Sequence, residues 1–184
     1  MLTAGRVRQA AAMIRAALAD LTPDALSGSE AAALAATCAD AERLLAATKA
    51  RLSLRVAETD TYRKAGYRTV ADWLAAISRT PVHQTKDLLQ TAEQVASNPP
   101  LDAAWIRGDL SVAEAKLIGS TAKLDRAATG ALLDTAAGGS YADVRAAAEN
   151  VKRRARGEDG ERAREARAHA GRFCRVWEPD GGGT

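Results

Sequence analysis

A stretch of thirty-two residues without glycine or proline, 30–61, constrains the fold of this chain more than any other feature. Glycine and proline disfavour helix interiors, so their absence favours one long helix. Apolar or small residues recur along it at alternating spacings of four and three: Leu34, Cys38, Ala41, Leu45, Thr48 and Leu52. This heptad spacing predicts a helix that packs along several others or pairs with a second chain. We expect Cys38, on this stripe, to be a small core residue.

Shorter helices are expected on both sides of this stretch. Residues 4–21 place apolar side chains on one helical face. Further helices are expected at 69–77, 81–97, 101–108, from Ser111 onward, at 125–137 and from Ser140 to about 157, most of them separated by Pro or Gly. Capping sequences begin several of them: Ser27–Glu30, Thr69–Asp72, Ser111–Glu114 and Ser140–Asp143. Residues 172–178 alternate like a strand. The predicted fold is therefore all-α, a multi-helix bundle with a long N-terminal helix and a short C-terminal strand-like segment.

Composition predicts what fills the core and how the chain divides. Hydrophobic residues make up 47% of the chain but aromatic residues only 4%, so we expect a core of Ala, Leu, Val and Ile. We predict a helical domain over 1–157, a charged linker or helix extension over 158–171, and the start of a following, truncated domain over 172–184. A single strand has no partner within the chain, which favours this last interpretation.

Two stretches have the pattern of a helix–turn–helix, in which the second helix can enter a DNA groove. In the first, the helix at 69–77 breaks at a corner containing Arg79, and the helix at 81–97 follows. With Leu88, Ala92 and Val95 inward, the outward or flanking residues that we expect to contact DNA are Arg79, His83, Gln84, Lys86 and Gln90. Asp87 on the same face is unfavourable beside phosphate, and two packed helices without a ligand are the alternative interpretation.

The second helix–turn–helix pattern joins residues 101–108 to the helix that begins at Ser111. Its sequence from Gly108 to Ala115 resembles the start of ParB-type DNA-binding helices. The outward residues Glu114 and Lys116 suit a nucleic-acid contact less well, so we expect this pair to serve packing.

Basic charge is concentrated near the C-terminus. The whole chain carries a net charge of only +3, whereas residues 152–175 contain nine basic and four acidic residues. The dense part of this segment comprises Lys152, Arg153, Arg154 and Arg156. Such a cluster suits binding to a phosphate backbone, and a solvated helix with mixed ion pairs is the alternative.

The sequence offers little for catalysis, metal binding or membrane insertion. His83 and His169 are not spaced with carboxylates or cysteines as a metal site requires, and nucleophile-elbow, phosphate-loop and zinc-protease motifs are absent. We therefore expect no catalytic residue, metal, cofactor or small-molecule substrate. Two distant cysteines, no signal peptide and no apolar run of membrane-spanning length favour a cytoplasmic protein.

Three blocks of the sequence together resemble a known family. They are residues 66–99, which start Gly-Tyr-Arg-Thr-Val-Ala-Asp-Trp, residues 108–115, and Phe173-Cys-Arg-Val-Trp-Glu-Pro-Asp-Gly. In order and spacing they are similar to the actinobacterial domain of unknown function 222, or 13E12 repeat family, from about residue 30 to the end. Members commonly carry an HNH endonuclease domain after this region and are often associated with mobile elements. Arg79 stands where related sequences more often have glycine.

The resemblance implies a role beside an enzyme. An HNH module cuts DNA with His and Asn residues around a divalent metal, and the catalytic residues of such a module are not in this chain. We therefore expect a non-catalytic N-terminal domain that helps to place an HNH-endonuclease-like protein on DNA. The alternative is an oligomerisation or interaction scaffold without nucleic-acid contact, in which the helix at 30–61 forms a homodimer.

Overall fold

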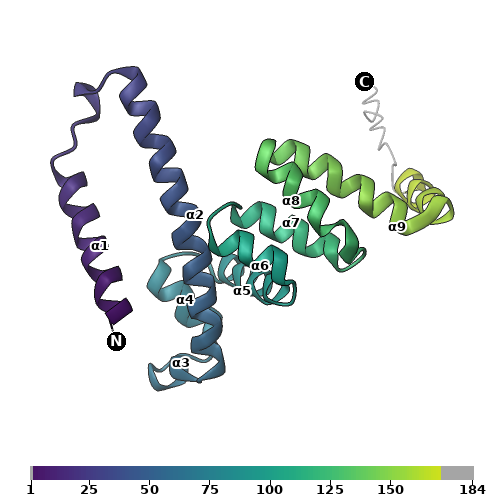
Figure 1. The fold of residues 1–184 in the computed structure, drawn as a ribbon. Helices are drawn as coiled ribbons and strands as arrows, with labels where there is room; N and C mark the ends of the chain where they lie inside the picture. Colours follow the sequence, from purple (N-terminus) through teal and green to yellow (C-terminus); the bar gives the residue numbers. More distant parts are fainter. Residues whose placement is uncertain (1, 171–184) are drawn as a thin grey trace, which may run out of the picture. The chain divides into compact units, whose positions relative to one another are not determined.

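The computed structural model describes residues 2–170 and confirms the all-α architecture (Figure 1). Within these residues the backbone forms nine α-helices and two short 3₁₀-helices, and it contains no strand. In chain order they are α1 (Leu2–Ala19), η1 (Pro23–Ala25), α2 (Gly28–Glu58), α3 (Thr61–Lys64), α4 (Val70–Ser78), α5 (Val82–Ala96), α6 (Pro99–Ile106), α7 (Val112–Ala122), η2 (Arg126–Ala128), α8 (Thr129–Gly138) and α9 (Tyr141–Ala170). The strand-like segment expected at 172–178 lies outside the described residues.

The chain divides into two compact units, residues 1–42 and 43–184, and the boundary falls inside α2. In the first unit no described side chain is buried. Apolar residues of α1, of the connection after it and of α2 are exposed: Val7, Met13, Ile14, Leu18, Leu21 and Leu34. The expectation that Cys38 is a core residue is wrong, because this side chain is exposed. The predicted domain limits at 157 and 171 stay predictions.

The second unit holds the core, which is built from α2 and α5–α9. Small side chains dominate it, as the composition predicts, and they let helix axes approach closely. Fully buried alanines occur on several of these helices: Ala47, Ala50, Ala92, Ala115 and Ala148. The large residues at the centre are Leu101, Trp105, Leu110, Ile118, Leu132 and Val144. Helix α7 packs against α5 on one side and against α8 and α9 on the other (Figure 1).

Side-chain caps begin the helices where the sequence predicts them. The Ser111 hydroxyl accepts the Glu114 backbone N–H at 3.2 Å, and the Glu114 carboxylate accepts the Ser111 backbone N–H at 2.8 Å. The Ser27–Glu30 and Ser140–Asp143 pairs make the same reciprocal contacts. These bonds satisfy N–H groups that would otherwise lack partners at a helix start.

Proline and glycine set the boundaries between the helices of the second unit. Pro99 and Pro100 end α5 and also begin α6, where a missing N–H costs nothing because the first helical residues have no intrahelical acceptor. Gly108 closes α6 with a φ of 80°. A Cβ atom at this glycine would lie 2.8 Å from Cγ of Leu44 on α2. Any residue other than glycine at position 108 would therefore prevent the α6–α7 corner from approaching α2 this closely.

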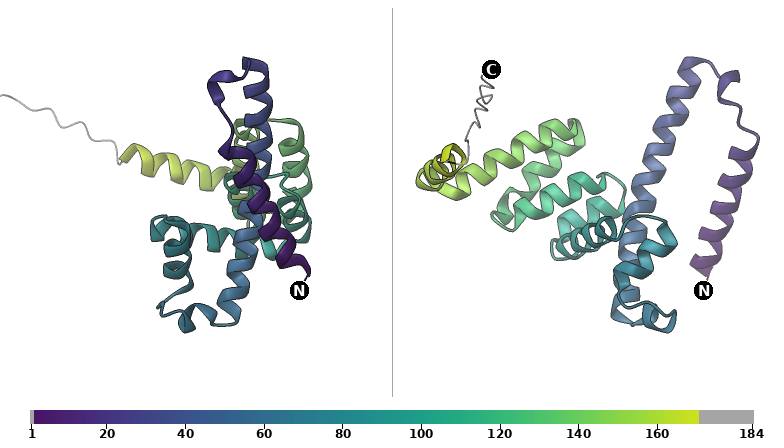
Figure 2. Two further views of the ribbon diagram at one scale, coloured as in Figure 1. Left: turned by 90° about the vertical axis from the view of Figure 1, so that its left-hand side faces the viewer. Right: turned by 180° about the vertical axis from the view of Figure 1, so that it is seen from behind.

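A single residue interrupts the last helix. Gly157 has φ 67° and ψ 167°, values that are not helical, and the two parts of α9 run in different directions (Figures 1 and 2). The first part packs on α7 and α8. Among the described residues, none of the helices combines the length and the hydrophobicity that crossing a bilayer requires.

Candidate nucleic-acid interface

The pair of helices α4 and α5 forms the corner that the first helix–turn–helix pattern predicts. The Thr69 hydroxyl accepts the Asp72 backbone N–H at 3.1 Å and so fixes the start of α4. Arg79 ends the helix in the left-handed conformation, with φ 53° and ψ 42°, and its N–H returns to the Ala75 carbonyl. Two residues later Pro81 leads into α5, and the two helices pack against each other.

One face of α5 is buried against α4 and α7. Leu89, Ala92 and Val95 lie in the core, whereas Leu88, which we expected inward, is only half-buried. Thr85 is also buried, and its hydroxyl lies 2.9 Å from the Ala71 carbonyl of α4. The hydroxyl therefore ties the start of α5 to α4 and fixes which residues of α5 face outward.

The structure places all five predicted residues of this corner at the surface. Four belong to the first three turns of α5 and one to the corner itself: His83, Gln84, Lys86, Gln90 and Arg79. The outward face of α5 thus carries neutral hydrogen-bonding groups beside basic ones. Hydrogen-bonding and basic side chains of this kind are the ones that contact base edges and phosphates in helix–turn–helix proteins.

An ion pair compensates the acidic residue on the same face. The Lys116 ammonium on α7 donates to Oδ2 of Asp87 at 2.7 Å. This hydrogen bond and the lysine's charge hold the pKa of the Asp87 carboxyl below its ordinary value. The negative charge that is unfavourable beside phosphate is therefore paired. Nothing in the sequence indicates this pair, because the two residues are 29 positions apart.

The N-terminus of α5 has no side-chain cap, and neither has that of α6. Pro81 occupies the N-cap position and provides no side-chain hydrogen bond, whereas side chains cap α4 and α7. The N-terminal end of a helix carries a partial positive charge that attracts anions. This charge adds to that of Arg79 and Lys86.

The predicted basic cluster of α9 is only partly available. The side chain of Lys152 is just 18% exposed and its ammonium pairs with Glu149 at 3.1 Å. Arg153, Arg154 and Arg156 are exposed in the turn before Gly157. Three of the four predicted residues therefore remain suited to a phosphate contact.

A second basic stretch, absent from the sequence prediction, runs from α3 into the segment before α4. Arg63, Lys64 and Arg68 are exposed there, and Arg63 pairs with Asp60 at 3.1 Å while its guanidinium lies 5.7 Å from the centre of the Tyr62 ring. The signal was present in the sequence, because no acidic residue occurs between Asp60 and Asp72.

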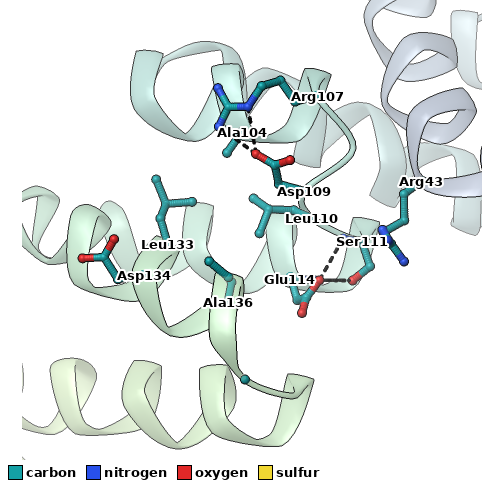
Figure 3. Close-up of a pocket in the computed structure, with 12 residues that line it drawn as sticks. Arg43, Ala104, Arg107, Asp109, Leu110, Ser111, Glu114, Leu133, Asp134 and Ala136 are labelled. Atoms are coloured by element: carbon teal, nitrogen blue, oxygen red, sulfur yellow. Dashed lines mark hydrogen bonds and ion pairs between the residues drawn. The ribbon is translucent and has the colours of Figure 1, made fainter. Parts of the chain in front are cut away.

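A hollow of about 820 Å³ lies beside the α6–α7 corner of the second unit (Figure 3). Several of its charged groups serve the local fold. Arg107 pairs with Asp109 at 2.7 Å, and the Ser111 hydroxyl and Glu114 carboxylate, 2.8 Å apart, form the capping box of α7. Nε of Arg43 donates to the Gly108 carbonyl. The hydroxyl–carboxylate pair in this hollow therefore starts a helix rather than activating a nucleophile.

Metal ligands do not gather in the part of the chain that the structure describes, where no three or more His, Cys, Asp or Glu side chains lie close enough to share an ion. The expectation that the chain needs no cofactor stays a prediction.

Comparison of the chain with protein-family models, with curated proteins and with solved structures gives no match. The resemblance to the domain of unknown function 222 therefore stays a prediction. Function is accordingly inferred from the geometry of α5 and from the charges beside it.

Proposed function

We propose that this chain is a non-catalytic helical module that binds DNA and positions an HNH-endonuclease-like protein on it. The observation that carries the proposal is the exposed face of α5, where His83, Gln84, Lys86 and Gln90 lie outward while the opposite face is buried. The pairing of Asp87 with Lys116 removes the main electrostatic objection to that face. The association with a nuclease comes from the family resemblance alone.

Different groups of the interface have different tasks in this proposal. Arg79, Lys86 and the arginines of α9 contact phosphates, which gives affinity without sequence preference. Gln84 and Gln90 have the donor and acceptor pair that matches the edge of adenine in the major groove. The phosphate contacts therefore set the register, and the two glutamines provide whatever base preference exists.

Salt-dependent binding to a labelled mixed-sequence duplex tests this function in the full chain. We expect measurable affinity at low salt that falls steeply as salt rises, because each phosphate contact releases condensed counterions. Replacing Arg153, Arg154 and Arg156 by alanine together should lower affinity for every duplex. It should also reduce the slope of log K against log salt by about 0.9 for each phosphate that the variant no longer neutralises.

A triple variant of equal charge provides the control. Arg6, Arg8 and Arg15 are exposed on α1, and their replacement by alanine also removes three positive charges. The proposal predicts that this second triple variant binds almost as the unchanged chain does. Equal weakening by both triple variants would show that the α9 arginines contribute only their charge. No binding even at low salt would show that neither the α5 face nor the α9 arginines form a DNA site.

A further inference from the structure

A row of exposed leucines runs along the part of α2 that belongs to the second unit. Leu45 and Leu52 expose 58 and 62% of their surface. On the other side of the same helix, Ala47 and Ala50 are fully buried in the core. Leucines of this size seldom lie together in water on a helix whose opposite face is already packed, so the row indicates a contact surface.

The exposed row and the buried row lie on opposite faces. With about 100° of rotation per residue, Leu45, Thr48 and Leu52 fall within about 60° of one another. Ala47, Ala50 and Leu54 fall roughly 140–200° from Leu45. The core of the second unit therefore leaves the Leu45–Leu52 face open, and this face is the one that the heptad repeat marks.

The spacing of the row selects the kind of partner. A repeat of seven residues keeps the same side chains facing a neighbour only when that neighbour is another helix that runs alongside. The repeat begins at Leu34, and α2 is 31 residues long, so the partner is a long helix. A second copy of α2 meets both requirements.

Residue sizes favour an antiparallel arrangement of the two copies. In the heptad, Leu45 and Leu52 are a positions, and Ala41 and Thr48 are d positions. In an antiparallel pair, each a position faces a d position of the other helix. Leu45 then faces Thr48, and Leu52 faces Ala41, so that each layer combines a large and a small side chain. A parallel pair would face Leu with Leu and Thr with Thr, and its layers would alternate between crowded and thin. Ala41 belongs to the first unit, and its place in the repeat is taken from the sequence.

Charges beside the seam favour the same arrangement. By the heptad of the sequence, Glu42 and Lys49 both occupy e positions, which flank the seam, and they are one heptad apart. In the antiparallel register that pairs Leu45 with Thr48, Glu42 of each copy lies beside Lys49 of the other. Two symmetric ion pairs result. In a parallel pair the same residues would face Thr37 and Leu44, with no charge complement.

We propose that the Leu45–Leu52 face of α2 binds the same face of a second copy of this chain, as an antiparallel helical pair. The proposal does not depend on DNA binding, since it uses a different helix from the α5 interface. It gives the alternative function, an oligomerisation scaffold, a defined surface, a defined partner and a defined register. Pairing would also give each assembly two α5 helices, and linked sites bind a long duplex more tightly than separate ones.

Sedimentation equilibrium over a range of concentrations tests this pairing in the full chain. We expect a monomer–dimer equilibrium, and Leu45→Asp should weaken it at least tenfold because a buried carboxylate has no partner in the seam. Leu124→Asp is the matched control, since Leu124 is 55% exposed two residues after the end of α7 and away from the row. It should leave the dimer intact. Circular dichroism establishes that both variants stay helical.

Two results would overturn the proposal. The first is a chain that stays monomeric at every concentration, as expected if α1 of the same chain covered the row with its exposed Val7, Ile14 and Leu18. The second is a dimer that Leu45→Asp and Leu124→Asp weaken equally.

Charge exchange and cross-linking test the orientation. Glu42→Lys or Lys49→Glu alone should weaken the dimer several-fold, and the double exchange should restore it. In a chain with Cys38→Ser and Cys174→Ser, the double change Glu42→Cys and Lys49→Cys should give a covalent dimer under mild oxidation, while each single change should not. A disulfide between the native Cys38 residues of two copies would instead show a parallel pair and contradict this register.

Discussion

Arg79 combines backbone strain with surface charge at a single position. Its φ of 53° places it in the left-handed region, which costs a residue with a Cβ about 1–2 kcal/mol. Glycine would adopt this conformation without that cost. An arginine in its place suggests that the guanidinium serves a purpose at the surface that outweighs the lower stability.

Two substitutions at this residue separate stability from binding. Arg79→Gly should raise the free energy of unfolding by about 0.5–1 kcal/mol, since relief of strain exceeds the added entropy of the unfolded chain. Arg79→Ala keeps a Cβ and should leave stability nearly unchanged. Both should reduce the salt slope of DNA binding by about 0.9, the value for one phosphate. Urea unfolding and salt titration measure the two effects, and unchanged DNA affinity in both variants would remove Arg79 from the interface.

Single residues also show what the sequence could predict about the site. The outward direction of His83, Gln84 and Gln90 followed from helical periodicity, because it depends only on spacing within one helix. The pairing of Asp87 with Lys116 did not, because it depends on how α5 and α7 pack. Local spacing therefore identified the side chains at the surface, and tertiary packing decided the net charge among them.

At the scale of elements, helix starts were more predictable than helix burial. The capping boxes at Ser27, Ser111 and Ser140 form within four residues, so the sequence contains all that determines them. The long helix that carries the apolar stripe, α2, was predicted correctly, but Cys38 on the stripe is exposed. Whether a stripe is covered depends on another element or another chain, and heptad spacing alone does not identify which.

Glycines at two corners provide a matched test of close approach between elements. Gly66 and Gly108 have similar φ values, 85° and 80°, but only Gly108 has a side chain, Leu44, where a Cβ would lie. Gly66→Ala should lower the free energy of unfolding by about 1 kcal/mol from backbone strain. Gly108→Ala should lower it by at least about 1 kcal/mol more, because Leu44 or the corner must move. If denaturant unfolding shows that Gly66→Ala and Gly108→Ala lower the free energy of unfolding equally, Leu44 on α2 can move aside without an energetic cost.

At the scale of the whole molecule, exposed carboxylates make folding sensitive to acid. Hydrogen bonds from Ser27 and Ser140 lower the pKa of Glu30 and Asp143 below their ordinary values, and Lys116 does the same for Asp87. A carboxyl whose pKa is lower in the folded state stabilises the fold above its unfolded pKa, near 4. That contribution disappears as the pH falls through the folded pKa.

Thermal melts across pH measure this effect. We expect a melting temperature that is nearly constant from pH 7 to about 5 and falls below about pH 4. Asp143→Asn, which keeps the shape of the cap but cannot ionise, should make the acid-side fall shallower. Asp134→Asn, at an exposed position inside α8, should leave it unchanged. An identical fall for all three proteins would mean that the caps do not contribute to acid unfolding.

The alanine-rich core has a spectroscopic consequence. Among its small aliphatic side chains lies one fully buried indole, that of Trp105, and its Nε1 has no hydrogen-bond partner among the described residues. The other tryptophan that the structure describes, Trp73, is only half-buried. An indole without contact to water emits at shorter wavelength than a hydrated one. The emission wavelength of Trp105 is therefore an intrinsic measure of how tightly α5, α6 and α7 pack around it.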